Sequence, residues 1–361
     1  MNPQDRQSAD GSLTPLDLTA LRFRPLAERP SKVHRADLGC PTGPNPTLSD
    51  WLDGLPDLLA VRGLKQLRDA VVDAHEDGRP IVAALGGHVV KTGCAPYLID
   101  WIDRGLLSAL ALTGSAAIHD LELAIAGKTS EEVGPGLIDG SFGFAQETSA
   151  LFVEACASSA TRNVGLGEAL GETISRTGGP GLDDSLIIAA RRAGIPVTVH
   201  VAIGTDVVHM TPDLDGASLG AATLADFRTI CQVVAGMSGG VWMNLGSAVV
   251  LPEVFLKALS IARNLGQPLD GLTTANLDFE QKYRGTLNVL QRPGARAVAL
   301  TGHHELMIPL LHAAVVTRIA AVGELPEPIA SLRNLRLDQG TVAPGPHSPA
   351  AVAPSRAEPL G

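Results

Sequence analysis

Short apolar runs recur along this 361-residue chain, and an amphipathic segment of helical length separates most runs from the next. Runs that are apolar at nearly every position predict strands buried on both faces, and intervening helices predict that the strands are parallel. The predicted strands are 80–87, 106–114, 195–204, 240–246, 269–276 and 295–302. The predicted helices are 55–75, 95–105, 115–127, 183–194, 225–236, 252–266 and 303–316. The pattern predicts an α/β fold with a doubly wound, mostly parallel, Rossmann-like sheet.

The composition agrees with this fold and narrows the function. A chain with 45% hydrophobic residues, only 3% aromatic residues and 39 glycines favours closely packed βαβ units. A net charge of −10 gives no electrostatic reason to expect nucleic acid or an anionic membrane as a partner. The four cysteines have no CxxC spacing, which is typical of reduced thiols in the cytoplasm. We expect no signal peptide and no membrane span, because no sufficiently long apolar run is present.

No break in the pattern divides the chain into two folding units. We therefore expect a single α/β domain at 15–335, with an irregular insertion at 128–182 that contains EEVGPG, DGSFG and GLGEALG. The polar segment 1–14 and the Pro/Ala-rich segment 336–361 are predicted to be disordered, because neither can build a core.

Each predicted strand ends in a loop of small residues, in most cases with a glycine. The loops read LGGHVVKTG, LTGSAAIHD, AIGTD, NLGSAVV, TTAN and LTGHHE. Glycine lets the backbone approach a phosphate closely, and a following helix N-terminus favours an anion. Ligands of open parallel sheets collect at the carboxyl ends of the strands. Although neither GxGxxG nor GxxxxGK[ST] is present, the loops together predict a dinucleotide site, with NAD as the cofactor.

Histidines and charged residues are frequent in these loops. His88 and Lys91 follow the first predicted strand, and His119 and His209 follow later ones. Because an imidazole titrates near neutrality, His119 or His209 is the predicted general base. A site formed by the loop histidines would bind metal, but no HExxH motif supports it, so no metal is predicted. His200 lies inside a strand and is expected to be a core histidine with a hydrogen-bond partner.

Four segments in order resemble deoxyhypusine synthase. They are IVAALGGHVVKTGCAPYLIDWIDRGLLSALALTGSAAIHDLELAIAG, SLIIAARRAGIPVTVHVAIGTD, VWMNLGSAVVLPEVFLKALSIARNLGQPLDGLTTANLD and ALTGHHELMIPLLHAAVV, within residues 80–320. The resemblance implies that family's NAD-binding sheet and a homotetramer with active sites at subunit interfaces. It places NAD contacts at Gly87, His88, Lys91, Thr113, Gly114, Ser115, His119, Gly204, Gly246, Ser247, Thr274, Ala275, His303 and His304.

The resemblance does not extend to the family's chemistry. Its nucleophilic lysine follows a serine–tryptophan–glycine run between the last two strands, whereas residues 283–300 here contain no lysine and Arg292 is the nearest basic residue. A guanidinium stays protonated, so Arg292 cannot form the imine that aminobutyl transfer needs. His209 stands where the family has a carboxylate that holds the polyamine. The predicted substrate pocket is cationic and is lined by His88, Lys91, His209, Arg284 and Arg292.

Three functional hypotheses follow. The first is an enzyme that uses NAD to oxidise a small polar substrate transiently, which enables group transfer, elimination or epimerisation. Its predicted catalytic residues are His119, His209, Asp206 and Arg292. The second is a polyamine aminobutyl transferase with Lys282 or Lys91 as nucleophile, which needs carboxylates such as Asp206, Glu253 and Asp278 in the pocket. The third is a non-catalytic NAD-binding subunit.

Overall fold

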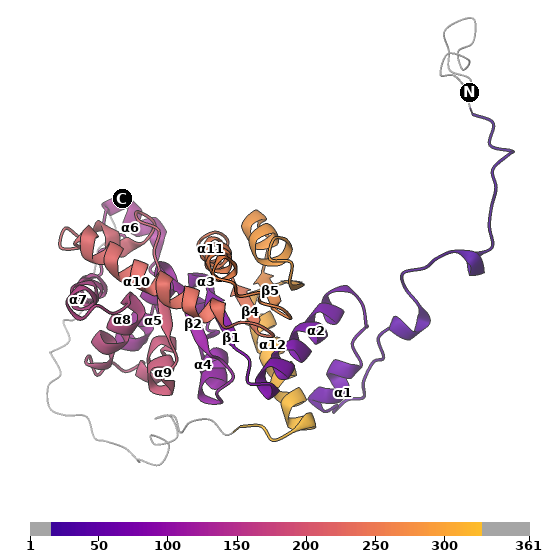
Figure 1. The fold of residues 1–361 in the computed structure, drawn as a ribbon, viewed down its shortest axis with the longest axis horizontal. Helices are drawn as coiled ribbons and strands as arrows, with labels where there is room; N and C mark the ends of the chain where they lie inside the picture. The colour runs from indigo at the N-terminus through magenta and orange to yellow at the C-terminus, as the bar shows by residue number, and fades with distance from the viewer. Residues whose placement is uncertain (1–15, 327–361) are drawn as a thin grey trace, which may run out of the picture.

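A six-stranded parallel sheet lies at the centre of the computed structural model, which describes residues 16–326 (Figure 1). Its strands are β1 (Ile81–Leu85), β2 (Ala109–Thr113), β3 (Val197–His200), β4 (Val241–Leu245), β5 (Thr273–Asp278) and β6 (Arg296–Thr301). They lie in the order β3-β2-β1-β4-β5-β6, and every neighbouring pair is parallel. The predicted α/β class and doubly wound, Rossmann-like sheet are confirmed. The strand order reverses between β1 and β4, where such sheets form a crevice at their carboxyl ends.

Helices cover both faces of this sheet. They are α1 (Leu48–Asp53), α2 (Leu59–Glu76), α3 (Gly87–Lys91), α4 (Ala95–Asp103), α5 (Gly114–Ala126), α6 (Val133–Asp139), α7 (Gln146–Arg162), α8 (Leu166–Ser175), α9 (Leu186–Ala193), α10 (Gly216–Ala235), α11 (Val250–Asn264) and α12 (His304–Val322). Ile81, Ala83 and Leu85 join one apolar cluster with α2, α4 and α12, whereas Val82 and Ala84 join another with α10 and α11. Alternate residues of β1 therefore point into opposite layers, and this is why the run contains no polar position.

Strand β5 begins and ends later in the chain than its apolar pattern indicates. The sequence analysis placed Thr274 and Ala275 at the strand end, but β5 continues through Leu277 to Asp278. Thr274 and Ala275 pair with Trp242 and Met243 of β4 in the first half of the strand, and both are fully buried. Their predicted position beside the cofactor is therefore corrected: the residues at the carboxyl end of β5 are Asp278 and those that follow it.

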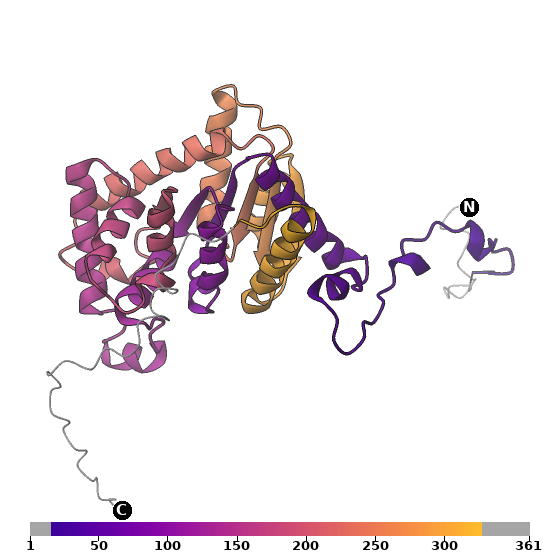
Figure 2. The same cartoon turned by 90° about the horizontal axis from the view of Figure 1, so that it is seen from below.

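The segment 128–182 is mostly helical, which corrects the prediction of an irregular insertion. It contains α6, α7 and α8, which lie at one end of the sheet (Figure 2). Its glycines allow close packing within regular structure. A Cβ at Gly167 of α8 would lie 2.2 Å from the carbonyl oxygen of Val197, so only glycine lets α8 lie directly on β3.

The N-terminal part of the described chain runs away from the sheet. Figures 1 and 2 both show residues 16–47 as an extended arm, which contains short 3₁₀ turns at Leu26–Glu28 and Arg35–Asp37. None of the residues of these two turns is buried, and Phe23 is 92% exposed. The predicted disordered segments 1–14 and 336–361 lie outside the described residues.

Helix α12 is apolar around most of its circumference. By length and composition it is the one candidate membrane span within residues 16–326, which the sequence analysis did not anticipate. The core helix of a soluble protein can have the same length and apolar composition. Helix α12 buries Ile308, Leu311 and Val315 in the apolar cluster that it shares with β5 and α2. The helix is therefore explained by packing on the sheet, although part of its surface stays uncovered.

Candidate functional site

The loops after β1 and β4 touch through glycine backbone at the reversal of strand order. The Gly86 amide donates to the Leu245 carbonyl at 2.9 Å, and the Gly246 amide donates to the Leu277 carbonyl at 3.0 Å. A Cβ at Gly86 would lie 2.1 Å from the Gly246 carbonyl oxygen, so no other residue fits there. Gly246 has φ +65°, which side chains rarely adopt. The bare backbone predicted from the sequence thus lies where the crevice should be.

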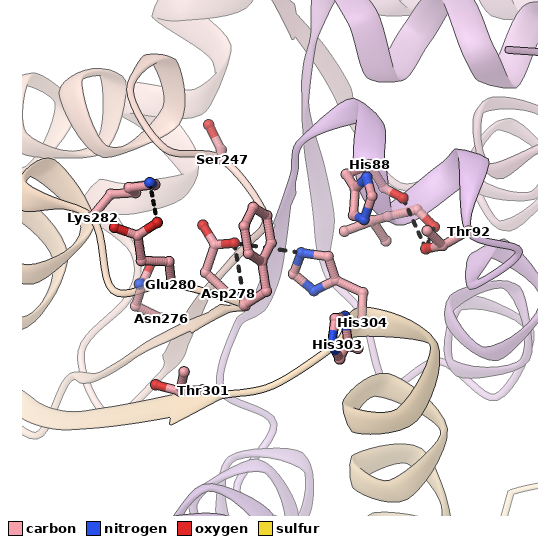
Figure 3. A network of polar contacts seen from close by, with 12 residues as sticks. His88, Thr92, Ser247, Asn276, Asp278, Glu280, Lys282, Thr301, His303 and His304 are labelled. Carbon is pink, nitrogen blue, oxygen red and sulfur yellow. Dashed lines mark hydrogen bonds and ion pairs between the residues drawn. The ribbon is translucent and has the colours of Figure 1, made fainter.

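His304 lies against Gly246 at this point. It is only 1% exposed, and neither ring nitrogen has a hydrogen-bond partner in the described part of the chain. Its Nε2 is 3.8 Å from Oδ1 of Asp278, and its ring centroid is 5.6 Å from that of His88 (Figure 3). Burial lowers the pKa of His304, so the ring is neutral near pH 7. Two buried ring nitrogens without a hydrogen-bond partner are unusual.

A chain of amide side chains, of which Asn244 and Asn276 are buried and Gln281 is half-buried, supports this half of the crevice. Asn244 Nδ2 donates to Asn276 Oδ1 at 2.6 Å, and Asn276 Nδ2 donates to Gln281 Oε1 at 2.8 Å. Gln281 Nε2 reaches the Leu300 carbonyl at 3.1 Å, which ties the ends of β4, β5 and β6 together. The amides Asn244, Asn276 and Gln281 were not identified from the sequence, whereas Asp278 was named there only as a carboxylate for the polyamine hypothesis. The sequence signal that could have identified them is a polar residue at alternate positions of a strand that is otherwise apolar and buried.

The loops after β2 and β3 form the other half of the site. Thr113 Oγ1 accepts from the Ala116 amide at 3.2 Å and lies 2.9 Å from Ser115 Oγ, so both hydroxyls belong to the N-terminus of α5. The Asp206 carboxylate lies over Gly114, where a Cβ would be 2.1 Å from its Oδ2. Burial raises the pKa of Asp206, although His209 and His119 oppose the shift. Asp206 therefore occupies the anion position at this helix end.

Gly87 joins the two halves. A Cβ at Gly87 would lie 2.9 Å from Ser115 Oγ and 3.1 Å from Cδ2 of His119. His119 is hydrogen-bonded through Nδ1 to Thr129 Oγ1 at 2.7 Å. Thr129 Oγ1 in turn donates to Glu122 Oε2 at 2.5 Å. Neither Thr129 nor Glu122 was expected at the site, although Glu122 lies three positions after His119 on the same helical face.

His209 lies in the loop after β3, held by backbone. Its Nδ1 accepts from the amides of Gly204, at 3.2 Å, and Asp206, at 3.3 Å. Gly204 has φ +90°, which explains why glycine stands there. The Nε2 of His209 is buried and has no hydrogen-bond partner within residues 16–326. His209, His119 and Asp206 are close enough for both imidazoles to influence the Asp206 carboxyl.

Three other residues predicted to contact the cofactor either are exposed or use their side chain in another contact. Lys91 is exposed at the end of α3. Ser247 Oγ accepts from the Leu251 amide at 3.2 Å and caps α11. His303 is exposed and lies 4.0 Å from Glu305.

Two predicted cations do not serve the pocket. Arg292 stands four residues before β6 begins, at the amino edge of the sheet, because a π-helix at Gly285–Gln291 has already carried the chain across. It donates to Asn288 at 2.6 Å. This backbone position does not support the catalytic role predicted for Arg292, which stays a prediction. Arg284 does lie near the carboxyl edge, but Nε of Arg284 bonds Glu253 at 2.9 Å, which neutralises it. The prediction of a cationic pocket is weakened accordingly.

A cavity of about 910 Å³ opens beside the His119 side of the site. Glu122, Glu131 and Glu147 line it together with Lys128, and apolar side chains such as Leu151 form part of its wall. This carboxylate-rich cavity was not predicted. Lys282, on the other side of the crevice, is paired with Glu280 in the loop after β5 (Figure 3).

Several buried ionisable groups have structural roles. His200 Nε2 lies 2.9 Å from Thr198 Oγ1, and burial lowers its pKa to about 4, as expected of a core histidine. Asp120 accepts from Ser185 Oγ and from the first amides of α9, and burial raises its pKa to about 6. Among residues 16–326 no group of three potential ligands is placed to hold a metal ion.

Comparisons with known proteins give only distant structural likenesses. No family model and no curated protein sequence matches the chain. Among solved structures it is similar to a ternary complex of AgrE with ornithine and NAD⁺ (16% identity, 72% of this chain and 33% of that chain, TM-score 0.47). It is also similar to a putative deoxyhypusine synthase from Entamoeba histolytica (11% identity, 78% and 96%, TM-score 0.46).

A third similar structure is ArgZ, an arginine dihydrolase from the ornithine–ammonia cycle in Cyanobacteria (17% identity, 72% and 33%, TM-score 0.44). The chain thus spans about a third of the length of ArgZ and of AgrE. At these identities and scores, none of the likenesses assigns a family or an activity to this chain, and the kinship with deoxyhypusine synthase stays a resemblance.

Proposed function

We propose that this protein is an enzyme that binds NAD at the carboxyl edge of the sheet and acts on a small polar substrate there. The observation that carries the proposal is the glycine backbone of Gly86, Gly87 and Gly246 at the reversal of strand order. Doubly wound sheets bind their ligands at this position. Bare backbone there lets a dinucleotide approach without meeting a side chain.

The polar groups of the crevice fit such a cofactor. His304 and His209 carry buried ring nitrogens without hydrogen-bond partners, which a bound polar molecule would satisfy. The residues that would hold NAD are Gly87, His88, Ser115, Gly246, Ser247 and His304. When bound, NAD supplies the capacity to accept a hydride from a carbon that carries a hydroxyl or amine. Because Asp206 already occupies the anion position of α5, a phosphate is expected beside Gly87 or Gly246 instead.

The chain's own residues would move the proton in this chemistry. His119 and His209 face the Asp206 carboxyl from the helix after β2 and the loop after β3. An imidazole side chain ordinarily has a pKa near neutral pH, and it therefore exchanges protons efficiently with a hydroxyl or amine of a substrate. We propose that they act as acid and base on a substrate held beside Gly87.

A polyamine or related organic cation is a second candidate substrate, and one observation favours it. The 910 Å³ cavity beside His119 is lined by Glu122, Glu131 and Glu147 against a single Lys128. Carboxylates with apolar side chains between them suit an amine on an aliphatic chain. In that case Lys282, which lies in the crevice loops with Glu280, is the candidate nucleophile.

We also propose that the protein works as a homo-oligomer, with a tetramer expected from the resemblance. Support comes from the extended arm, on which Leu16, Leu21, Phe23 and Leu26 are exposed. Apolar side chains on a described segment without a core beneath them favour burial against another copy. Light scattering at micromolar concentration should give a particle several times the 37.4 kDa chain mass. A particle of one chain would refute this proposal.

Thermal unfolding with and without NAD tests the main proposal. A ligand at one hundred times its dissociation constant stabilises the folded state by roughly 2.7 kcal/mol, so the Tm should rise. His304→Ala should reduce this rise, and His75→Ala at the end of α2, on the opposite edge, should leave it unchanged. If saturating NAD leaves the wild-type Tm unchanged and no NAD co-purifies, the proposal is wrong.

A further inference from the structure

The protonation pattern of the two candidate catalytic histidines can be deduced from their hydrogen bonds. His119 Nδ1 lies 2.7 Å from Thr129 Oγ1, and Thr129 Oγ1 lies 2.5 Å from Glu122 Oε2. Thr148 Oγ1 lies 3.2 Å from the other oxygen, Glu122 Oε1. Glu122 thus ends a hydrogen-bonded chain that begins at the His119 ring.

The carboxylate fixes the direction of every bond in this chain. Burial alone would raise the pKa of Glu122, but the hydrogen bonds from Thr129 and Thr148 and the nearby His119 ring hold it below its ordinary value, so Glu122 is ionised near pH 7. An ionised carboxylate only accepts, and both threonine hydroxyls must therefore donate to it. The single hydrogen of Thr129 is used in this way, so His119 Nδ1 must be the donor to Thr129. In the neutral ring, Nε2 then carries the lone pair.

The free nitrogen lies on the side of the ring that faces the crevice. Cδ2, the ring carbon bonded to Nε2, is the His119 atom nearest the bare face of Gly87, 3.1 Å from where a Cβ would stand. The His119 side chain is 21% exposed, so a ligand can reach it. The Nε2 lone pair is therefore available beside the glycine turn after β1.

His209 has the opposite arrangement. Its Nδ1 accepts from the backbone amides of Gly204 and Asp206, and backbone amides can only donate. Its proton must therefore lie on Nε2, which is buried and has no hydrogen-bond partner among the described residues. One histidine of the pair presents a lone pair and the other presents an N–H group.

We propose that Glu122 and Thr129 are positioning residues that set His119 as the proton acceptor of this site, while His209 is a hydrogen-bond donor. The proposal rests on the function proposed above and deepens it. A proton from a substrate hydroxyl or amine moves to His119 Nε2, while Nδ1–H keeps its bond to Thr129. The resulting imidazolium has Glu122 Oε2 3.8 Å away and Asp206 nearby, which stabilise its charge. His209 Nε2–H would then donate to the oxygen or nitrogen that loses the proton, rather than compete with His119 for it.

Nitrogen-15 NMR of the imidazole rings in the full-length protein tests this assignment without any substrate. His119→Gln and His209→Gln identify the two sets of signals. We expect the Nδ1–H form for His119 and the Nε2–H form for His209 in the same neutral-pH spectrum. Because isolated histidine prefers the Nε2–H form, the His119 result would show that Thr129 imposes the less common state. An Nε2–H form at His119 would overturn the proposal.

Variants of Thr129 separate positioning from a structural role. Thr129→Ser keeps the hydroxyl and should keep His119 in the Nδ1–H form, whereas Thr129→Val removes the acceptor and should shift most of the population to Nε2–H. The His209 signals should stay unchanged in both variants. If Thr129→Val leaves His119 entirely as Nδ1–H, Thr129 does not position the ring and the proposal fails. The tautomers do not depend on NAD, so a failure to bind NAD would refute only the proposed function.

Discussion

The Asp226 carboxyl makes a quantitative prediction about stability. It lies on α10, almost fully buried, and accepts from the amides of Gly167 at 2.9 Å and Val199 at 2.7 Å, which fixes α8 and β3 to each other. Burial raises its pKa from 3.8 to about 7, against the opposing effect of these hydrogen bonds. The folded state thus holds the Asp226 proton more tightly than the unfolded state does.

The sign and size of the effect follow from linkage. A raised pKa contributes stability that is complete below pH 4 and is lost as the pH rises through about 7. A shift of about three pKa units corresponds to about 4 kcal/mol, most of which falls between pH 5 and pH 8. Asp226→Asn removes this titration. Between pH 5 and pH 8 the free energy of unfolding of the variant should therefore fall less than that of the wild type, by about 2–3 kcal/mol.

Urea unfolding at pH 5 and pH 8 gives the change in the free energy of unfolding with pH for the wild type and for the variant. Only the difference between these two changes is interpreted, because Asn also alters the hydrogen bonds at every pH. Asp120, whose pKa is raised to about 6, is present in both proteins and cancels. Asp215→Asn is a matched control: Asp215 caps α10 in an exposed position, and its hydrogen bonds to Ser218 lower its pKa, outside this window. Equal changes for wild type and Asp226→Asn would show that the carboxylate is already ionised in the folded protein.

Three further predictions address the crevice. Gly86→Ala places a Cβ 2.1 Å from the Gly246 carbonyl and should lower the free energy of unfolding by about 1–3 kcal/mol, whereas Gly43→Ala, which meets nothing within 4 Å, should not; an unchanged Tm for Gly86→Ala would contradict the contact. Arg292→Ala should leave the NAD-induced rise in Tm intact, because Arg292 lies at the amino edge; a lost response would show that this placement is wrong. Incubation with NAD and spermidine, followed by borohydride, should leave the protein mass unchanged under the leading proposal; a stable adduct on Lys282 would favour the polyamine candidate instead.

Most strands could be predicted because a strand that is buried on both faces consists almost entirely of apolar residues. Strands β1, β2 and β4 are buried at every position, and each appears as an apolar run ending near a glycine. The last two residues of β5, Leu277 and Asp278, were not predicted because the polar residue Asn276 resembles the end of an apolar run, although it is buried. Asn276 is paired with Asn244 and Gln281, which a rule based on apolar runs cannot detect.

The site was predictable as an edge of the sheet but not as a set of contacts. Glycine loops placed His88, His119, His209 and His304 at the carboxyl edge of the sheet, where the structure has them. Arg292 was misplaced because the π-helix Gly285–Gln291 has no sequence signature, so its direction across the sheet could not be foreseen. The proton positions of the histidines depend on Thr129 and on backbone amides, and these contacts exist only in the folded chain.

A structure of the protein determined with NAD present tests the central claim most directly. The account predicts one dinucleotide per chain along the carboxyl ends of β1 and β4, with its phosphates beside Gly87 or Gly246 and a polar atom within hydrogen-bond distance of His304. Density for NAD at the amino edge or on the outer helices, or its absence at saturating concentration, would contradict the account.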